Sequence, residues 1–202
     1  MSDIKHIVSF SGGKDSTAML LRMIDLKMPI DEVRYFDCGS WEFPEIIEHI
    51  LSIQHEIEPI KFKRVYPVMN WDIKKTIKGM PSGGYKWCSG DKINALHKGL
   101  KKRDTIFYLG FGYDEKKRFK GRTARHYPAV APLIAWKWTE KDCLDYCYSK
   151  GFTFGGLYKY FNRVSCWCCF NKNAEEKKMM RIFYPYLWKK YVVMYARYKY
   201  KT

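Results

Sequence analysis

Apolar residues in the first half of the chain recur at two different spacings. Short apolar runs, typical of buried strands, alternate with longer stretches in which an apolar residue returns every three or four positions, as on one face of a helix. In the stretch 45–57, Ile46 and Ile50 recur at helical spacing, whereas Glu48 and His49 are expected to point outward. The pattern predicts strands at 4–10, 32–37, 60–66 and 105–111, and helices at 17–27, 45–57 and 92–102.

This alternation favours one fold class. Strands separated by helices of this length imply right-handed crossovers, which give a parallel sheet with helices on both faces. The predicted fold is therefore α/β, with an open, mostly parallel, Rossmann-like sheet. The segment 70–90 contains Gly79, Pro81 and Gly83, and it is predicted to be a surface loop.

The last third of the chain is predicted to be helical. Thr139 is an N-cap residue, with Asp142 three positions on to complete a capping box. From residue 174 the helical pattern is interrupted at Pro185, and the residues become basic and aromatic. We predict one domain over residues 1–173, followed by a basic aromatic helical tail over residues 174–202 that packs on the domain or extends from it.

A glycine-containing stretch, residues 9–16, follows the first predicted strand and opens the first predicted helix. Gly12 and Gly13 allow a tight turn in which successive backbone N–H groups point at an anion, and the helix N-terminus adds partial positive charge. Lys14 adds a full positive charge. Thr17 stands where a Walker A loop needs its second glycine, so the stretch predicts a phosphate cradle of another kind.

The motif SxGGKDS in this position resembles the PP-loop of the ATP pyrophosphatase superfamily, also called adenine nucleotide alpha hydrolases. The stretches 35–45 (YFDCGSWEFPE) and 110–118 (GFGYDEKKR), and the order of residues from Pro132 to Cys169, are similar to the phosphoadenylyl-sulfate (PAPS) reductase family. The resemblance implies an adenine nucleotide alpha hydrolase-like fold. It also implies an enzyme whose PP-loop holds the pyrophosphate of ATP, or of a related adenine nucleotide, while the α-phosphorus is attacked.

The resemblance, and the position of these loops at the carboxyl ends of strands, indicate the nucleotide site. Lys14, Asp15 and Arg118 are the predicted catalytic residues: Lys14 neutralises pyrophosphate, and Arg118 meets a phosphate bidentately. A magnesium ion (Mg2+) is expected on Asp37 or Asp15. The predicted nucleotide-binding residues are Ser9, Ser11, Gly12, Gly13, Lys14, Asp15, Ser16, Asp37, Gly39, Glu42, Gly112 and Glu115.

Seven cysteines in a chain with no export signal are expected to be thiols rather than disulfides. Cys88, Cys166, Cys168 and Cys169 resemble the ligands of iron–sulfur members of the superfamily, which implies a [4Fe-4S] cluster. Zinc (Zn2+) held by four thiolates and free core thiols are the alternatives. The adjacent pair Cys168 and Cys169 rarely binds one ion without strain, and Cys38 is a candidate reactive thiol beside the nucleotide site.

Lys and Arg number 37 against 21 Asp and Glu, a formal net charge of +16. This excess favours polyanionic partners. In the tail, cations alternate with aromatic rings suited to stacking on bases, so tRNA or another nucleic acid is a predicted partner; an amphipathic helix packed on the sheet explains the same pattern. With no signal peptide and no apolar run long enough for a membrane helix, we expect a cytoplasmic protein that binds no membrane.

Three functions fit these features, and the first is preferred. It is adenylation with pyrophosphate release, coupled to sulfur transfer at a cysteine-bound cluster that a sulfur or electron donor serves. The second is reduction of a sulfonucleotide such as PAPS, although the tail cysteine of thioredoxin-dependent PAPS reductases has no counterpart after Cys169. The third is a non-catalytic nucleic-acid-binding module whose PP-loop senses the nucleotide.

Overall fold

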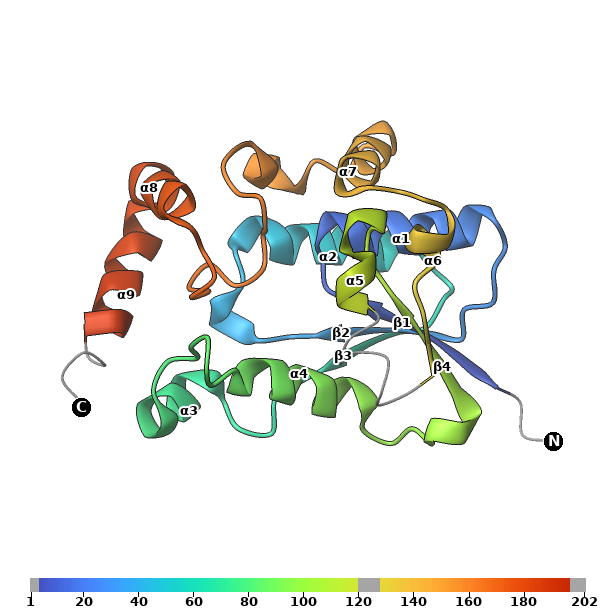
Figure 1. Ribbon diagram of the computed structural model, residues 1–202, viewed down its shortest axis with the longest axis horizontal. Helices are drawn as coiled ribbons and strands as arrows, with labels where there is room; N and C mark the ends of the chain where they lie inside the picture. Colours follow the sequence, from blue (N-terminus) through green and yellow to red (C-terminus); the bar gives the residue numbers. More distant parts are fainter. Residues whose placement is uncertain (1–3, 120–127, 197–202) are drawn as a thin grey trace.

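Five parallel strands form one open sheet in the order β3-β2-β1-β4-β5 (Figure 1). The computed structural model describes residues 4–119 and 128–196. At the centre of the sheet, Val8 pairs with Val33 on one side and with Tyr108 on the other. The predicted α/β class with a parallel sheet is confirmed. The strands are β1 (Lys5–Phe10), β2 (Glu32–Phe36), β3 (Phe62–Val65), β4 (Thr105–Leu109) and β5 (Ala129–Val130).

Helices cover both faces of the sheet. α1 (Lys14–Asp25) and α2 (Pro44–Glu56) lie on one face, and α3 (Trp71–Lys78) and α4 (Trp87–His97) lie on the other (Figure 1). Within the described ranges, no helix has the length and apolar character needed to cross a membrane. The remaining helices are α5 (Lys116–Phe119), α6 (Pro132–Ala135), α7 (Glu140–Ser149), α8 (Ala174–Phe183) and α9 (Pro185–Ala196), with the 3-10 helices η1 (Gly39–Trp41), η2 (Lys102–Asp104), η3 (Tyr113–Glu115) and η5 (Phe154–Lys159).

The segment 70–90 is partly helical, which corrects the prediction of a loop. The Asn70 side chain caps α3 by accepting hydrogen bonds from backbone N–H groups of its first turn, and the buried Trp71 anchors it. Gly79, with φ +78°, ends α3. α4 then begins at Trp87 rather than at residue 92. The glycines and the proline therefore confine the loop to the short stretch between two helices.

The capping box predicted at Thr139 and Asp142 is present at the start of α7. The Thr139 hydroxyl accepts the Asp142 N–H at 3.3 Å, and the Asp142 carboxylate accepts the Thr139 N–H at 2.8 Å. This reciprocal pair fixes where α7 begins, and therefore where Glu140 enters the site described below.

The chain after residue 173 forms two helices that pack on the rest of the molecule. Asn173 caps α8, and α9 begins at Pro185, where the pattern predicts an interruption. Between them, the Tyr184 hydroxyl donates a 2.8 Å hydrogen bond to the Glu45 carboxylate of α2. Residues 197–202 of the predicted tail lie outside the described residues.

His49 is buried between α1 and α2, which corrects the outward position expected from the periodicity. Its ring centroid lies 4.3 Å from that of Phe154, and its Nε2 atom shares a 3.0 Å hydrogen bond with Thr17 Oγ1. Burial lowers the pKa of His49 to about 4. A neutral imidazole therefore links α2 to α1, the helix that follows the PP-loop.

Acid should destabilise the fold through His49. A histidine whose pKa is lower in the folded than in the unfolded state (about 6.5) makes the fold less stable as the pH falls through the unfolded value. We expect His49 to remove roughly 2 kcal/mol of unfolding free energy between about pH 7 and about pH 5. Urea unfolding of the wild type and of His49→Gln at both pH values measures this loss, which should be smaller in the variant. An equal loss in both proteins would contradict the assignment.

Candidate functional site

A cavity of ≈ 450 Å³ opens where β1 and β4 end. From β1 the chain continues to β2 and from β4 to β5, which lie toward opposite edges of the sheet, so a crevice forms between the loops that follow β1 and β4. The cavity is therefore where nucleotides bind in open α/β sheets. Its wall includes these predicted catalytic and nucleotide-binding residues: Ser9, Ser11, Gly13, Lys14, Asp15, Ser16, Glu42, Glu115 and Arg118.

Close backbone packing shapes the loop between β1 and α1. Gly12 has φ +75°, a left-handed conformation that glycine adopts without strain. Gly110, after β4, passes so close to α1 that a Cβ atom there would lie 2.8 Å from the Ser16 backbone nitrogen. Ser16 Oγ accepts the N–H of Ser11 at 3.1 Å and donates to the carbonyl of Gly13 at 3.0 Å. The protein's own contacts thus define the loop conformation.

The predicted phosphate-binding lysine is buried and paired. Lys14 is 6% exposed, and its Nζ atom lies 2.7 Å from Glu140 Oε2 and 3.6 Å from Asp15 Oδ2. Its backbone N–H donates to the Tyr158 hydroxyl at 2.8 Å. Burial disfavours the charged amine, but the two carboxylates outweigh burial and raise the pKa of Lys14. Neither Glu140 nor Tyr158 was predicted as a site residue, because they lie 126 and 144 residues from Lys14 in the sequence.

Asp15 carries an oxygen that the protein leaves without a partner. Within the described part of the chain, Asp15 Oδ1 is buried and makes no hydrogen bond. Burial, together with the carboxylates of Glu140 and Glu115, raises the pKa of Asp15 to about 6 against the opposing charge of Lys14. Oxygen ligands of this kind are what Mg2+ prefers, so the residues present fit the predicted ion.

Four of the predicted nucleotide-binding residues lie outside the cavity wall: Gly12, Asp37, Gly39 and Gly112. The Asp37 carboxylate accepts the N–H of Gly39 at 2.8 Å and lies 3.5 Å from the Arg64 guanidinium. These contacts describe a turn at the end of β2. Of the two carboxylates predicted for magnesium, only Asp15 lines the cavity.

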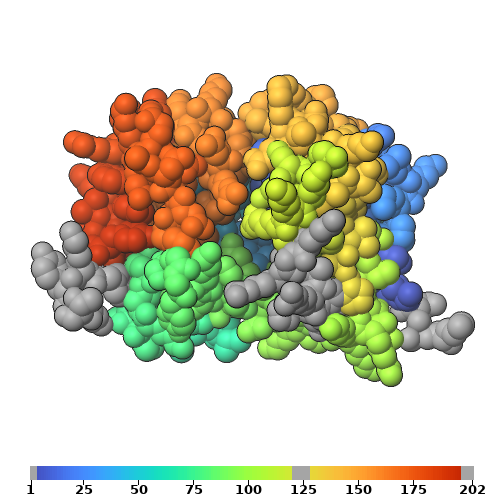
Figure 2. Space-filling model, in the orientation of Figure 1, coloured from blue at the N-terminus to red at the C-terminus, as the bar shows by residue number. Residues whose placement is uncertain are grey.

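A second cavity, of ≈ 300 Å³, adjoins the first. All four predicted metal ligands line it, and Figure 2 shows the molecule hollowed near its centre, between the green atoms of the α3–α4 region and the orange atoms before α8. The wall that the two cavities share carries cations, which attract anionic groups. An anionic group bound at this wall therefore lies beside the cysteines. The residues that line both cavities are Ser89, Lys92, Arg118, Arg163 and Ser165.

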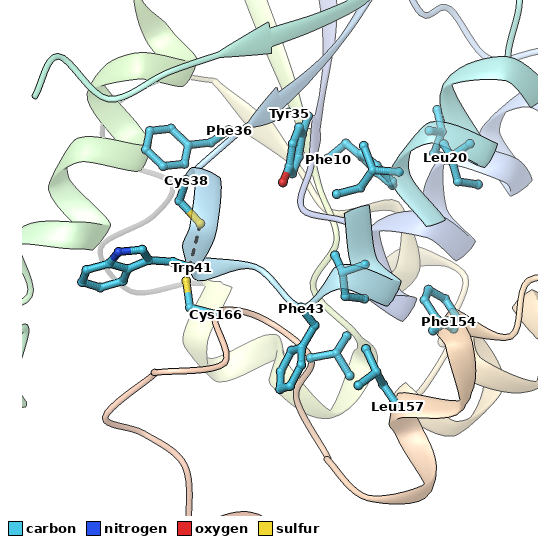
Figure 3. Packing of buried hydrophobic residues seen from close by; sticks show 14 of the residues in the cluster. Phe10, Leu20, Tyr35, Phe36, Cys38, Trp41, Phe43, Phe154, Leu157 and Cys166 are labelled. Carbon is cyan, nitrogen blue, oxygen red and sulfur yellow. Dashed lines mark hydrogen bonds between the residues drawn. The ribbon is translucent and has the colours of Figure 1, made fainter. Parts of the chain in front are cut away.

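Cys38 and Cys166 meet beside this cavity, although 128 residues separate them. Their Sγ atoms lie 3.8 Å apart and point toward one another (Figure 3). Cys38 also donates to Glu42 Oε1 at 2.9 Å, and all three ligand atoms lie within 4.8 Å of one another. Trp167 holds this arrangement, since its backbone and indole N–H groups donate to carbonyls of η1 at 2.9 and 2.7 Å.

The charge environment favours a thiolate at Cys166. The contact with Cys38 and the charge of Lys92 lower the pKa of the Cys166 thiol against the opposing effect of burial. Lys92 itself is half-buried, and burial disfavours its charge, yet Cys166, Glu42 and Cys38 together raise its pKa. The sequence analysis did not single out Lys92, although its position four residues after Cys88 was a signal, since one helical turn separates them.

The four predicted cysteines line one cavity, but their sulfur atoms do not converge on a single point. Among the described residues, no three of Cys88, Cys166, Cys168 and Cys169 have sulfur atoms within 4.8 Å of one another, which a shared zinc ion requires. They surround a cavity instead, and a cation lies beside them. Iron–sulfur clusters bound by thiolates are anionic centres, so this arrangement suits them.

Comparison with known proteins places these features in a family. A family model described as "Phosphoadenosine phosphosulfate reductase domain" matches residues 5–172. Two uncharacterized proteins of Methanocaldococcus jannaschii, MJ0066 and MJ0973, are 27% and 24% identical to the chain over 197 and 210 residues. These matches cover 92% and 95% of this chain but 40% and 48% of the relatives, so the chain spans less than half the length of either relative.

A solved structure is also similar. The U34-tRNA thiolase NcsA from Methanococcus maripaludis, solved with its [4Fe-4S] cluster, matches with a TM-score of 0.49 and 15% identity, over 98% of this chain and 73% of that one. A likeness at this level carries no information on chemistry. The family model covers most of the chain, including the PP-loop and the late cysteines, and the resemblance noted in the sequence is confirmed. The chain therefore belongs to the phosphoadenosine phosphosulfate reductase domain family, within the PP-loop superfamily of adenine nucleotide alpha hydrolases.

Proposed function

We propose that the chain activates an acceptor with ATP, or a related adenine nucleotide, and then directs sulfur to it. In the first step an acceptor oxygen attacks the α-phosphorus, the bond to the β-phosphate breaks, and pyrophosphate leaves. In the second step sulfide delivered by a sulfur donor attacks the activated carbon, the carbon–oxygen bond breaks, and AMP leaves with that oxygen. The observation that carries this proposal is the wall shared by the nucleotide cavity and the cysteine cavity.

The PP-loop would hold the pyrophosphate part of the nucleotide. Its backbone N–H groups and the start of α1 supply partial positive charge, and Lys14 supplies a full charge. Because Lys14 is buried, its attraction for phosphate is less screened than that of a surface lysine. Phosphate oxygens would compete with Glu140 for this ammonium, since Glu140 holds it when no nucleotide is bound.

Asp15 and Arg118 would complete the nucleotide site. Asp15 would offer Mg2+ a buried oxygen that has no hydrogen-bond partner among the described residues, and the ion would neutralise the triphosphate and polarise the reacting phosphoryl group. Arg118 pairs with Glu115 and lies on the shared wall, where it would stabilise negative charge that develops at the α-phosphate. Catalysis would rest on positioning and electrostatics rather than on a covalent intermediate.

The cysteine cavity would hold the metal centre. Cys88, Cys166 and Cys169 line it and would bind an iron–sulfur cluster, with Lys92 as the neighbouring counter-charge. Such a cluster, when bound, supplies electron transfer or a site for inorganic sulfur. The adenylated acceptor would reach it across Arg118 and Arg163, whose charges attract its phosphate.

Sulfonucleotide reduction is the second candidate, and the family match favours it. The same cavity would bind the adenylyl sulfate, and the sulfate would face the cysteines. Release of sulfite from PAPS or adenylyl sulfate distinguishes this reaction from release of pyrophosphate from ATP. Binding of ATP with neither product would instead support a nucleotide-sensing module.

The surface of α8 and α9 supports a nucleic acid as the acceptor. Lys189 and Lys190 are exposed beside the exposed ring of Tyr186, whereas Tyr191 is buried against the rest of the molecule. Some aromatic residues of α8 and α9 thus pack against the molecule, whereas others are exposed to solvent. The exposed cations and ring are suited to contact the phosphates and bases of RNA.

Replacing Lys14 should abolish turnover. In Lys14→Ala the pyrophosphate loses the one full charge of the PP-loop, so pyrophosphate release from ATP should fall about 100-fold or more. A coupled pyrophosphate assay measures it, with Lys150→Ala as a control because Lys150 pairs with Asp25 at the surface. Normal turnover in Lys14→Ala would defeat the assignment of the PP-loop as the reaction site.

Neutralising Glu140 should strengthen nucleotide binding. In Glu140→Gln the Lys14 ammonium loses its 2.7 Å ion pair and the cavity loses a negative charge, so ATP should bind about threefold to tenfold more tightly. Isothermal titration calorimetry with magnesium and ATP tests this, and Glu175→Gln, at an exposed carboxylate on α8, is the matched control. Weaker binding in Glu140→Gln would show instead that Glu140 helps to bind the nucleotide.

Removing two surface charges should weaken RNA binding. For Lys189→Gln with Lys190→Gln, the slope of log affinity against log salt should decrease by about 1.5, because each phosphate contact contributes about 0.7 to 0.9. Filter binding of an unmodified tRNA transcript at several salt concentrations measures the slope. The control is the pair Lys27→Gln with Lys150→Gln, at the ends of α1 and α7, away from α9 in Figure 1. An unchanged slope in the α9 variant would rule out this surface.

A further inference from the structure

Tyr158 lines the nucleotide cavity and contacts the PP-loop through its hydroxyl group. The hydroxyl oxygen accepts the backbone N–H of Lys14 at 2.8 Å, and a Cβ atom at Gly13 would lie 3.5 Å from the same oxygen. The Tyr158 ring centroid lies 5.2 Å from Lys14 Nζ. The phenol of Tyr158 therefore sits at the turn where the PP-loop is expected to meet phosphate.

This contact occupies one of the backbone donors of the loop. An N–H group in a phosphate cradle is expected to point at the bound anion, but the N–H of Lys14 already donates to Tyr158. A phosphate oxygen can respond in two ways. It can displace the phenol from this N–H, or it can leave the phenol in place and accept the phenol's own hydrogen.

The Tyr158 hydroxyl has a hydrogen that the protein does not use. A phenol offers one O–H donor in addition to its acceptor sites. Within residues 4–119 and 128–196, the Tyr158 hydroxyl makes one hydrogen bond, and in that bond it is the acceptor. Burial raises the pKa of Tyr158, so the phenol keeps its proton at neutral pH. The O–H group is therefore available to an acceptor that enters the cavity.

Close packing holds Tyr158 in place. Phe154 and Leu157, on the same 3-10 helix η5, are buried in the core (Figure 3). The ring of Phe154 packs edge-on against that of Tyr158, with centroids 4.9 Å apart. Gly155, with φ +58°, lies so near α2 that a Cβ atom there would be 2.5 Å from Glu45 Cβ. These contacts disfavour displacement of the phenol, and a donor that is already in place needs little reorganisation when an anion binds.

We propose that Tyr158 binds the pyrophosphate part of the nucleotide, as a relay between the Lys14 backbone N–H and a phosphate oxygen. In this relay the N–H donates to the phenol oxygen, and the phenol O–H donates to the phosphate. Hydrogen bonds in series polarise one another, and a bond to a charged acceptor is stronger than one between neutral groups. The inference rests on the proposed function in taking the cavity as the nucleotide site, and it is independent of the reaction that follows.

Pyrophosphate binding by Tyr158→Phe tests the relay. Isothermal titration calorimetry with Mg2+ and inorganic pyrophosphate, and with Mg2+ and ATP, measures affinity without turnover. Both ligands should bind about tenfold more weakly to the variant, because one hydrogen bond to a charged group is lost. Tyr146→Phe is the matched control, since the Tyr146 hydroxyl donates to Asp25 of α1 and Tyr146 is not part of the cavity wall. Its affinities should equal those of the wild type.

Tighter binding by Tyr158→Phe would overturn the inference, because it would show that the phenol competes with phosphate for the Lys14 N–H. Unchanged affinity would overturn it as well. A monofluorinated tyrosine in place of Tyr158 gives a second measurement, since fluorine makes the phenol a stronger donor and a weaker acceptor. The contact with Lys14 is present with and without ligand, so its weakening largely cancels. The relay therefore predicts several-fold tighter pyrophosphate binding, and equal or weaker binding would contradict it.

Thermal melting of the unliganded proteins separates a lost contact from a lost fold. Weaker binding by Tyr158→Phe at a wild-type melting temperature supports the relay, and where that variant fails to fold, the fluorinated protein decides. ATP that binds to the wild type without release of pyrophosphate would contradict the proposed reaction and leave the relay standing. A wild type that binds neither pyrophosphate nor ATP would overturn both.

Discussion

The parallel pairing of β1 with β4 is the constraint on which the rest of the structure depends. The register that sets Ser9 opposite Leu109 brings the two following loops together, and Gly110 then passes α1 at a distance that no side chain would tolerate. A crevice between these loops follows from the pairing, because the chain continues from β1 to β2 toward one edge of the sheet and from β4 to β5 toward the other. The nucleotide cavity, and through its shared wall the cysteine cavity, are consequences of one pair of strands.

Although the chain is strongly basic, carboxylates line part of its nucleotide cavity. Asp15 and Glu140 pair with Lys14, whereas the cations Lys92, Arg118 and Arg163 line the wall shared with the second cavity. This arrangement suits a nucleotide that binds a divalent ion near the carboxylates and whose anionic product then moves toward the cations of the shared wall.

Features that depend on neighbouring residues could be predicted from the sequence, whereas features made by residues far apart in the sequence could not. The PP-loop, the helix cap at Thr139 and the parallel α/β class depend on local spacing, so they could be predicted. The ion pair of Lys14 with Glu140 and the contact of Cys38 with Cys166 join residues 126 and 128 positions apart, so no local pattern encodes them. The buried position of His49 likewise depends on η5, which packs over α2 from far along the chain.

Three tryptophans form a cluster at the cysteine cavity, and their fluorescence depends on what that cavity holds. Trp41, Trp71 and Trp87 are buried, with ring centroids 5.1 to 6.0 Å apart, and the first two line the cysteine cavity. Indole emission is quenched by a nearby chromophore that accepts its energy, and iron–sulfur centres absorb in that range. The intrinsic fluorescence of this chain is therefore a built-in reporter of what occupies the cavity, readable in the intact protein without any added label.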